Sequence, residues 1–399
     1  MHWRRFSFLV ILGFALTIFS FACTNLNREA TQTPQTPTTQ QTDKPQISSL
    51  PPQTQEIVKS AGANDLFYPP RGDVRLVAIS DLNSAYGSTD YDPEVDKAIN
   101  LLPFWQPDMV VCSGDMIAGQ KKSLTEAQIK AMWAAFDNHI AAPLRQANIP
   151  FGFTIGNHDA SGAKKEGNFV FEQERDLASE YWNNPEHDPG IEFIDKSQFP
   201  FFYTFKHKDI FFMAWDGSTH RIPPDKLAWV EKALASPQAQ QAKMRILLSH
   251  LPLYAVAEGR NKFGAVMANA DELRQMLEKY NVHTYISGHQ HAYYPGHRGK
   301  LQLLHMGLIG SGPRALIGTQ VPSAKAITVV DINFNSPELT TYTTYDMKTL
   351  ELIEYKQLPR FLTGHNGIVL RRDVEYKDLK AEEKAACVDK IGEQFCQNQ

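Results

Sequence analysis

The stretch "FTIGNHDAS", residues 153–161, decides the fold, because an apolar run leads directly into a cluster of polar side chains. Residues 153–155 are typical of the end of a buried strand. A glycine then leads into Asn157, His158 and Asp159, whose polar groups are costly to bury without partners. These residues alone leave two interpretations open: a turn that caps the strand, or a site that holds Asn and His against a metal or a substrate.

Short apolar runs that end in a small or polar residue recur along the chain, at 74–80, 108–114, 150–156, 210–217, 244–250 and 283–288. Such runs are typical of strands that are buried on both faces. Helical patterns lie between several of them, at 93–102, 122–146, 223–236 and 268–280. This alternation predicts an α/β architecture with much of the sheet parallel. Three later runs without helices, at 301–307, 325–334 and 339–347, are expected to be antiparallel additions to a second sheet.

Polar side chains gather at the ends of five of these predicted strands, where open α/β sheets bind ligands. The residues are Asp81 and Asn83, Asp115, Asn157 with His158 and Asp159, His250, and His289 with His291. Carboxylates, imidazoles and an amide form a mixed nitrogen and oxygen ligand set without thiolate, which suits Zn, Fe, Mn and similar ions. The set exceeds what one ion needs. Two ions that share a carboxylate, about 3.5–4 Å apart, fit better and suit displacement at phosphorus.

The order of these blocks, D-x-[HN], G-D, G-N-H-[DE], H and G-H-x-H, resembles the calcineurin-like metallophosphoesterase superfamily. The resemblance covers residues 74–310, and five blocks in order are far more specific than any one of them. It implies an α/β fold of two packed mixed β-sheets flanked by helices, in four layers α/β/β/α. It also implies a metal-dependent phosphoric ester hydrolase with two divalent or trivalent metal ions (Mn, Fe, Zn or similar).

The metal ligands that the resemblance implies are Asp81 and His291 for the first ion, Asn157, His250 and His289 for the second, and Asp115 as the carboxylate that both share. One position departs from the family pattern, because Asn83 stands where a histidine is usual. An amide oxygen is a weaker ligand than imidazole, so either Asn83 binds the first ion or a water takes its place.

The resemblance also implies catalytic roles for His158 and Asp159. His158 would face the scissile ester, and would protonate the leaving oxygen or stabilise the charged phosphoryl group. Asp159 would orient His158 through its other ring nitrogen. The expected partner is a small phosphate ester, and the sequence leaves open whether it is a monoester or a diester. An alternative function is a surface lipoprotein of the same fold that binds phosphorylated ligands with weak catalysis or none, and Asn83 keeps this alternative open.

The N-terminus is predicted to be a targeting segment. Two arginines precede an apolar stretch, residues 6–21, and Cys23 follows a small residue. This pattern resembles a bacterial lipoprotein signal with Cys23 lipidated, and an uncleaved membrane anchor is the second interpretation. Either way the protein would be exported to the periplasmic or cell-surface face of the membrane. The expected domains are a signal at 1–23, a disordered Thr/Gln/Pro-rich linker at 24–70, the metallophosphoesterase domain at 71–347, and a C-terminal extension at 348–399.

The formal net charge of −4 and the lack of a long basic run argue against a nucleic-acid partner. Two of the four cysteines, Cys387 and Cys396, lie near the C-terminus. On one continuous helix they would be roughly 13 Å apart by rise alone, whereas a disulfide needs Cα atoms within about 7 Å. Export would place them where disulfides persist. We therefore predict that they are bonded and that the helix breaks between them, at Gly392.

Overall fold

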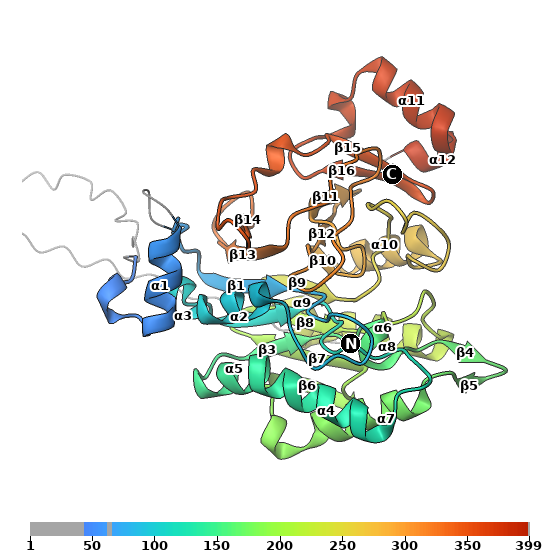
Figure 1. Cartoon of the computed structure of the whole chain (residues 1–399). Coiled ribbons are helices and arrows are strands. Elements are labelled where there is room, and N and C mark those ends of the chain that lie inside the picture. Colours follow the sequence, from blue (N-terminus) through green and yellow to red (C-terminus); the bar gives the residue numbers. More distant parts are fainter. Residues whose placement is uncertain (1–43, 62–65, 398–399) are drawn as a thin grey trace, which may run out of the picture. The chain divides into compact units, whose positions relative to one another are not determined.

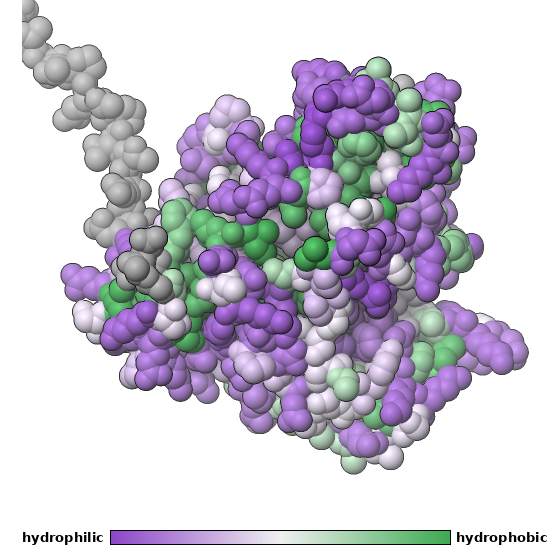
Figure 2. Space-filling model, turned by 45° about the horizontal axis from the view of Figure 1, so that its top comes forward, coloured by the Kyte–Doolittle hydropathy of each residue, from purple (hydrophilic) through white to green (hydrophobic). Residues whose placement is uncertain are grey.

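The structure of the protein is a computed structural model that describes residues 44–61 and 66–397, all of which belong to one compact unit. The predicted signal at 1–23, Cys23, and the predicted linker up to residue 43 lie outside the described residues. No helix in the two described ranges combines the length and the apolar character that crossing a bilayer requires. On the face shown in Figure 2, hydrophilic residues predominate and hydrophobic residues form smaller groups between them.

Two mixed β-sheets organise the described chain (Figure 1). The five-stranded sheet has the order β14 (Thr340–Asp346), β13 (Ala326–Ile332), β1 (Val74–Ile79), β2 (Met109–Cys112), β3 (Phe151–Phe153). The nine-stranded sheet has the order β15 (Phe361–Gly364), β16 (Gly367–Arg371), β11 (Tyr294–Arg298), β12 (Leu301–His305), β10 (Thr284–Ser287), β9 (Met244–Leu248), β8 (Ile210–Ala214), β7 (Phe202–His207), β6 (Glu192–Gln198). Strands β1, β2 and β3 are parallel, as are β8, β9, β10 and β12, and the remaining pairs are antiparallel.

The two sheets pack face to face through side chains such as Leu76 and Val111 of one sheet and Phe205 and Phe212 of the other. Helices cover the outer face of the five-stranded sheet: α1 (Pro52–Ser60), α2 (Pro93–Asn100), α3 (Leu102–Trp105), α4 (Glu126–Phe136), α5 (Ala142–Gln146) and α7 (Glu172–Asn183). The nine-stranded sheet is covered by α8 (Pro224–Leu234), α9 (Pro237–Gln241) and α10 (Ala270–Lys279). The predicted four-layer α/β/β/α fold is thus confirmed.

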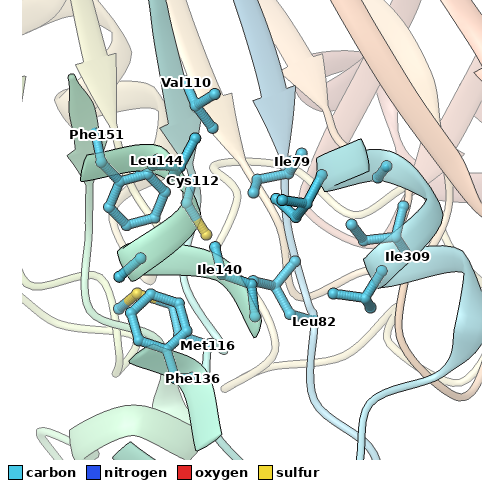
Figure 3. Packing of buried hydrophobic residues seen from close by; sticks show 14 of the residues in the cluster. Ile79, Leu82, Val110, Cys112, Met116, Phe136, Ile140, Leu144, Phe151 and Ile309 are labelled. Carbon is cyan, nitrogen blue, oxygen red and sulfur yellow. The ribbon is translucent and has the colours of Figure 1, made fainter. Parts of the chain in front are cut away.

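The central strands carry apolar side chains on both faces because each sheet lies between helices and the other sheet. All six residues of β1 are buried. Figure 3 shows the helix side of this arrangement, where Ile79, Val110 and Phe151 of three neighbouring strands pack with Phe136 and with the helical residues that follow it. This packing explains the uninterrupted apolar runs in the sequence.

The predicted disordered linker at 24–70 extends too far, because residues 44–61 are folded. A 3₁₀ turn (Ile47–Ser49) leads into α1, where Thr54 and Val58 are buried against the domain. The Thr54 hydroxyl donates a hydrogen bond to the carbonyl of Asn100, at 2.6 Å. Composition misses this helix because a few apolar residues are enough to dock it on a surface that the rest of the chain provides.

Two further expectations about the sheets are corrected by the pairing. Strands β13 and β14 extend the five-stranded sheet, next to β1, and β12 runs parallel to β10 rather than antiparallel. The predicted domain end at residue 347 is too early, because β16 pairs with β11 and β15 pairs with β16. Residues 361–371 therefore complete the nine-stranded sheet, and such pairing depends on partners far away in the sequence.

The C-terminal region contains the predicted disulfide between Cys387 and Cys396, whose Cα atoms are 5.8 Å apart. Helix α11 (Ala381–Ile391) ends at Gly392, whose φ of +87° is readily adopted only by glycine, and α12 (Glu393–Cys396) follows. Both cysteines are buried against β16. The bond therefore joins α11 to α12, and the predicted helix break at Gly392 is confirmed.

Candidate metal centre

The predicted ligands lie at the carboxyl ends of β1, β2, β9 and β10 and at the start of the short helix α6 (Asn157–Ala160), which follows β3. Parallel pairing aligns these ends: Ile79 is opposite Cys112, and Cys112 is opposite Phe153. A hydrogen bond of 2.8 Å between His250 Nδ1 and the carbonyl of Ser113 joins the ends of the two sheets. The site therefore lies where both sheets end on the same side.

Close backbone packing brings the loops together. A Cβ atom on Gly156 would lie 2.2 Å from the amide nitrogen of Asp115, and one on Gly288 would lie 2.5 Å from Oδ2 of Asp81. Only glycine avoids these clashes. Asp81 and Asp115 themselves have positive φ angles of 50° and 55°. Such strained backbone persists only where the surroundings enforce it, and it is common at functional sites.

At the centre of the site, one ligand atom from each of Asp81, Asp115 and His250 lies within 4.8 Å of the others, and all three residues are buried. The Nε2 atom of His250 is 3.2 Å from Asp115 Oδ2, 2.9 Å from Asn157 Oδ1 and 3.2 Å from His289 Nδ1. The amide of Asn157 donates to Gln120 Oε1 at 2.8 Å, which turns its oxygen toward His250. Four electron-pair donors thus converge.

A second group of donors surrounds Asp81. The Nε2 atom of His291 lies 3.2 Å from Asp81 Oδ1, while its Nδ1 faces the carbonyl of Gly312 at 2.9 Å. Because a carbonyl only accepts, Nδ1 carries the proton and Nε2 offers its lone pair to the site. The backbone amide of His289 holds the Asp81 carboxylate at 3.1 and 3.2 Å.

These donors need a positive charge among them. Since the Nδ1 proton of His250 points to Ser113, the facing Nε2, carboxylate and amide oxygen are all acceptors unless Nε2 is protonated. One proton satisfies only part of the group, whereas a metal ion can bind all of it. The residues present therefore fit metal ions. The predicted ligands of the second ion, Asn157, His250 and His289, lie together, and so do Asp81 and His291, two predicted ligands of the first ion.

The electrostatics of the cluster lead to the same conclusion. Burial lowers the pKa of His250, but the carboxylates of Asp115 and Asp81 outweigh burial and raise it to about 9. Burial raises the pKa of Asp115, but His250 and His158 outweigh it and hold the pKa well below its ordinary value. The field of two buried carboxylates thus favours a cation, so metal binding should displace a proton.

His158 lies beside the cluster. Among the described residues, no hydrogen bond joins its ring to a predicted ligand. Its Nδ1 is 3.1 Å from the carbonyl of Gly119, and its backbone amide donates to Asp115 Oδ1 at 2.8 Å. The ring packs against Tyr86, whose side chain is 57% exposed, with the centroids 5.0 Å apart. This position allows the ring to face a substrate and does not make it a ligand.

The predicted role of Asp159 is wrong. Its carboxylate accepts backbone N–H groups of Asp115, Met116, Ile117 and Gly156, at 2.7–2.9 Å. The carbonyl of Gly119, and not Asp159, holds the His158 ring. Burial and the charge of Asp115 raise the pKa of Asp159 to about 7, although the N–H groups of Gly156 and Ile117 lower it. Asp159 therefore shapes the loop that presents Asp115.

Asn83 is buried beside the first-metal side of the site, and its backbone is fixed there. Its N–H donates to the carbonyl of Asp115 at 3.3 Å, and its carbonyl accepts from the Ser311 amide at 3.1 Å. Within the described ranges its side-chain amide makes no hydrogen bond. The amide oxygen is therefore available to an ion or to a water.

We predict that Asn83→His tightens the first metal ion, because imidazole is a better donor than an amide for late divalent ions. A competition titration of metal-loaded protein with a chelator measures the change. Equal or weaker affinity in a folded variant would show that position 83 does not reach the ion. Asn148→His, at an exposed turn outside the site, is the matched control.

A cavity of about 1000 Å³ lies beside the site, and none of its lining residues is a predicted ligand. Its wall includes Arg175, which forms a buried ion pair with Asp216 at 2.8 Å and donates to the carbonyl of Ala160 in α6. The cavity thus adjoins the helix that carries Asn157. Gly119 and Gln120 also support the site, through His158 and Asn157, and their position shortly after Asp115 is the one signal of this in the sequence.

Comparison with known proteins supports this architecture. A family profile described as calcineurin-like phosphoesterase matches residues 74–293, more than half of the chain. No curated protein matches the sequence. Among solved structures, the purple acid phosphatase PPD1 from yellow lupin (Lupinus luteus) is similar in fold: 16% identity, TM-score 0.50, over 72% of this chain and 54% of that one. The match thus spans about half of the lupin chain.

Two further solved structures match with lower TM-scores. GAP50 of Plasmodium, described as the anchor in the inner membrane complex, is 14% identical over 80% of this chain and 94% of that one, with a TM-score of 0.45. A dimetal phosphatase from Danio rerio is 14% identical over 65% of this chain and 93% of that one, with a TM-score of 0.42.

Proposed function

The chain belongs to the calcineurin-like phosphoesterase family, and from this premise we propose that it hydrolyses phosphate esters at a centre of two metal ions. The observation that carries the proposal is the convergence of buried ligand atoms from Asp81, Asp115 and His250 within 4.8 Å. The proposed ligands are those implied by the sequence: Asp81 and His291 for one ion, Asn157, His250 and His289 for the other, and Asp115 for both. When bound, two such ions hold a phosphoryl group and lower the pKa of water, which then serves as the nucleophile.

The chain's own residues position these ligands and handle the proton. Asp159 fixes the loop that carries Asp115 through four backbone amides. His158 keeps Nδ1 toward the carbonyl of Gly119, at 3.1 Å, so Nε2 is the nitrogen left to exchange a proton with the substrate. We assign to Nε2 the delivery of a proton to the leaving oxygen. The ring of Tyr86 packs beside that of His158, with the centroids 5.0 Å apart.

The competing function is a protein that binds phosphorylated ligands without turnover. The free side-chain amide of Asn83 supports it, because a weakly held first ion would weaken catalysis more than binding. An activity panel separates the two functions: protein reconstituted with Mn, Fe or Zn is tested on aryl phosphate monoesters and diesters, with chelated protein as control. Metal-dependent turnover supports hydrolysis, and two bound ions without turnover on any substrate would favour the binding function.

We also propose that the protein is exported and tethered to a bacterial membrane, by a lipid on Cys23 or by an uncleaved anchor. Support comes from the apolar stretch at 6–21 after two arginines, and from the Cys387–Cys396 disulfide, a bond that persists mainly in oxidising compartments. Labelling with a fatty-acid analogue tests the lipid. Label on the wild type and none on Cys23→Ser is expected, and an unlabelled, cytosolic wild type would contradict the tether.

A further inference from the structure

An arginine lies against one of the proposed metal ligands. The Nη1 atom of Arg260 is 3.1 Å from Nδ1 and 2.5 Å from Nε2 of His289. No carboxylate pairs with Arg260 among residues 44–61 and 66–397. A buried or half-buried arginine normally has an acidic partner. Arg260 departs from this rule, so its guanidinium lacks an anion.

A second arginine approaches from the neighbouring segment. The chain at Ala257 forms an antiparallel bridge with Leu316, and the amide of Arg314 donates to the carbonyl of His291 at 3.0 Å. A Cβ atom on Gly259 would lie 2.9 Å from Arg314 Nη1, so this guanidinium passes directly over the residue before Arg260. Arg260 thus contacts one histidine of the G-H-x-H block through its side chain, and Arg314 contacts the other through its backbone.

The second guanidinium also lacks an acidic partner. In the described part of the chain Arg314 makes no ion pair, and its Nε is buried with no hydrogen-bond partner. Burial and the positive charge of Arg260 both lower the pKa of Arg314. Two like charges that crowd together without a carboxylate are unfavourable unless an anion lies between them.

Only one nitrogen of the Arg260 guanidinium, Nη1, contacts His289. Its other two nitrogens, Nε and Nη2, have no hydrogen-bond partner among the described residues, so they remain available to an anion beside the site.

We propose that Arg260 and Arg314 form an anion subsite for the terminal phosphoryl oxygen of a phosphate monoester, which makes monoesters the preferred substrates of the proposed hydrolysis. The reason is the chemistry of the substrate. A monoester is close to dianionic at neutral pH and keeps three unesterified oxygens, so one oxygen remains for a guanidinium fork beyond those held by metal ions. A diester carries one negative charge, and the corresponding oxygen bears a second alkyl or aryl group.

The test compares Arg314→Gln and the double variant Arg260→Gln/Arg314→Gln with wild type. Arg314→Gln is the decisive variant, because among the described residues no hydrogen bond or ion pair joins the Arg314 side chain to a proposed ligand, so its loss should leave metal content unchanged. Arg221→Gln is the matched control, since Arg221 is exposed and the cavity that it lines contains none of the proposed ligands and neither of the two arginines. Inorganic phosphate binding to metal-loaded protein is measured by calorimetry, metal content by elemental analysis, and kcat/KM on one aryl monoester and one aryl diester.

We expect Arg314→Gln to weaken phosphate binding about 10-fold, the double variant more, and the monoester-to-diester ratio of kcat/KM to fall by a similar factor. The control should match wild type in all three measurements. Unchanged phosphate affinity and an unchanged ratio at full metal content would overturn the subsite. The two proposals can also fail separately. If the wild type hydrolyses no ester and the variants still bind phosphate more weakly, the anion subsite is supported and the proposed hydrolysis is overturned.

Discussion

Asp115→Ala should remove both metal ions and lower phosphoesterase turnover by about 10⁴-fold or more, the scale on which a central group of a site is lost. The physical reason is the position of the carboxylate. Its Oδ2 lies 3.2 Å from His250 Nε2, and its Oδ1 accepts the His158 amide at 2.8 Å. Without this carboxylate, the ligands around His250 and those around Asp81 lose the negative charge that lies between them and that both ions would share.

Elemental analysis of the folded variant measures the loss. Asp209→Ala is the matched control, because Asp209 is an exposed carboxylate whose ion pair with Lys243 lies on the surface. The control should keep two ions per chain and full turnover. Two ions still bound to Asp115→Ala would show that Asp115 is not the shared ligand.

His158→Ala should lower turnover by roughly 10²–10⁴-fold while metal content stays near that of wild type. The substitution removes the ring but keeps the backbone amide that donates to Asp115, so the cluster should keep its shape. The loss should therefore appear in kcat, and it should be smaller for substrates whose leaving group is a weak base and needs little protonation.

His220→Ala serves as the control for this variant. His220 packs against the exposed ring of Phe263, at 4.8 Å between centroids, and is not among the proposed ligands. We expect its turnover to match that of wild type. A His158→Ala protein that loses metal would make His158 a ligand, and one with unchanged turnover would remove it from the mechanism.

The position of the site could be predicted from the sequence because a general rule applies to it. Parallel strands end on one edge of a sheet, so the polar residues that follow β1 and β2 lie near one another, as do those that follow β9 and β10. The packing of the two sheets against each other then brings the two pairs together. Apolar runs without alternation predicted these strands, since both faces of each sheet are covered. The family pattern then supplied the roles that spacing alone could not.

Other features depend on contacts that leave no pattern in the sequence. Asp159 binds backbone N–H groups, which every residue except proline provides, so its partners could not be read from residue types. Arg260 reaches His289 because its loop pairs with the segment around Leu316, more than fifty residues later. Helix α1 and strand β16 were missed for the same reason, because distant parts of the chain hold both in place.

The central claim is that the ends of two sheets bind two metal ions through a shared Asp115. Crystals of metal-loaded protein, measured on both sides of the metal's absorption edge, test it most directly. We predict two anomalous peaks, one beside His250 and one beside His291, with the carboxylate of Asp115 in contact with both. A single peak, or two peaks with Asp115 bound to neither, would contradict the account.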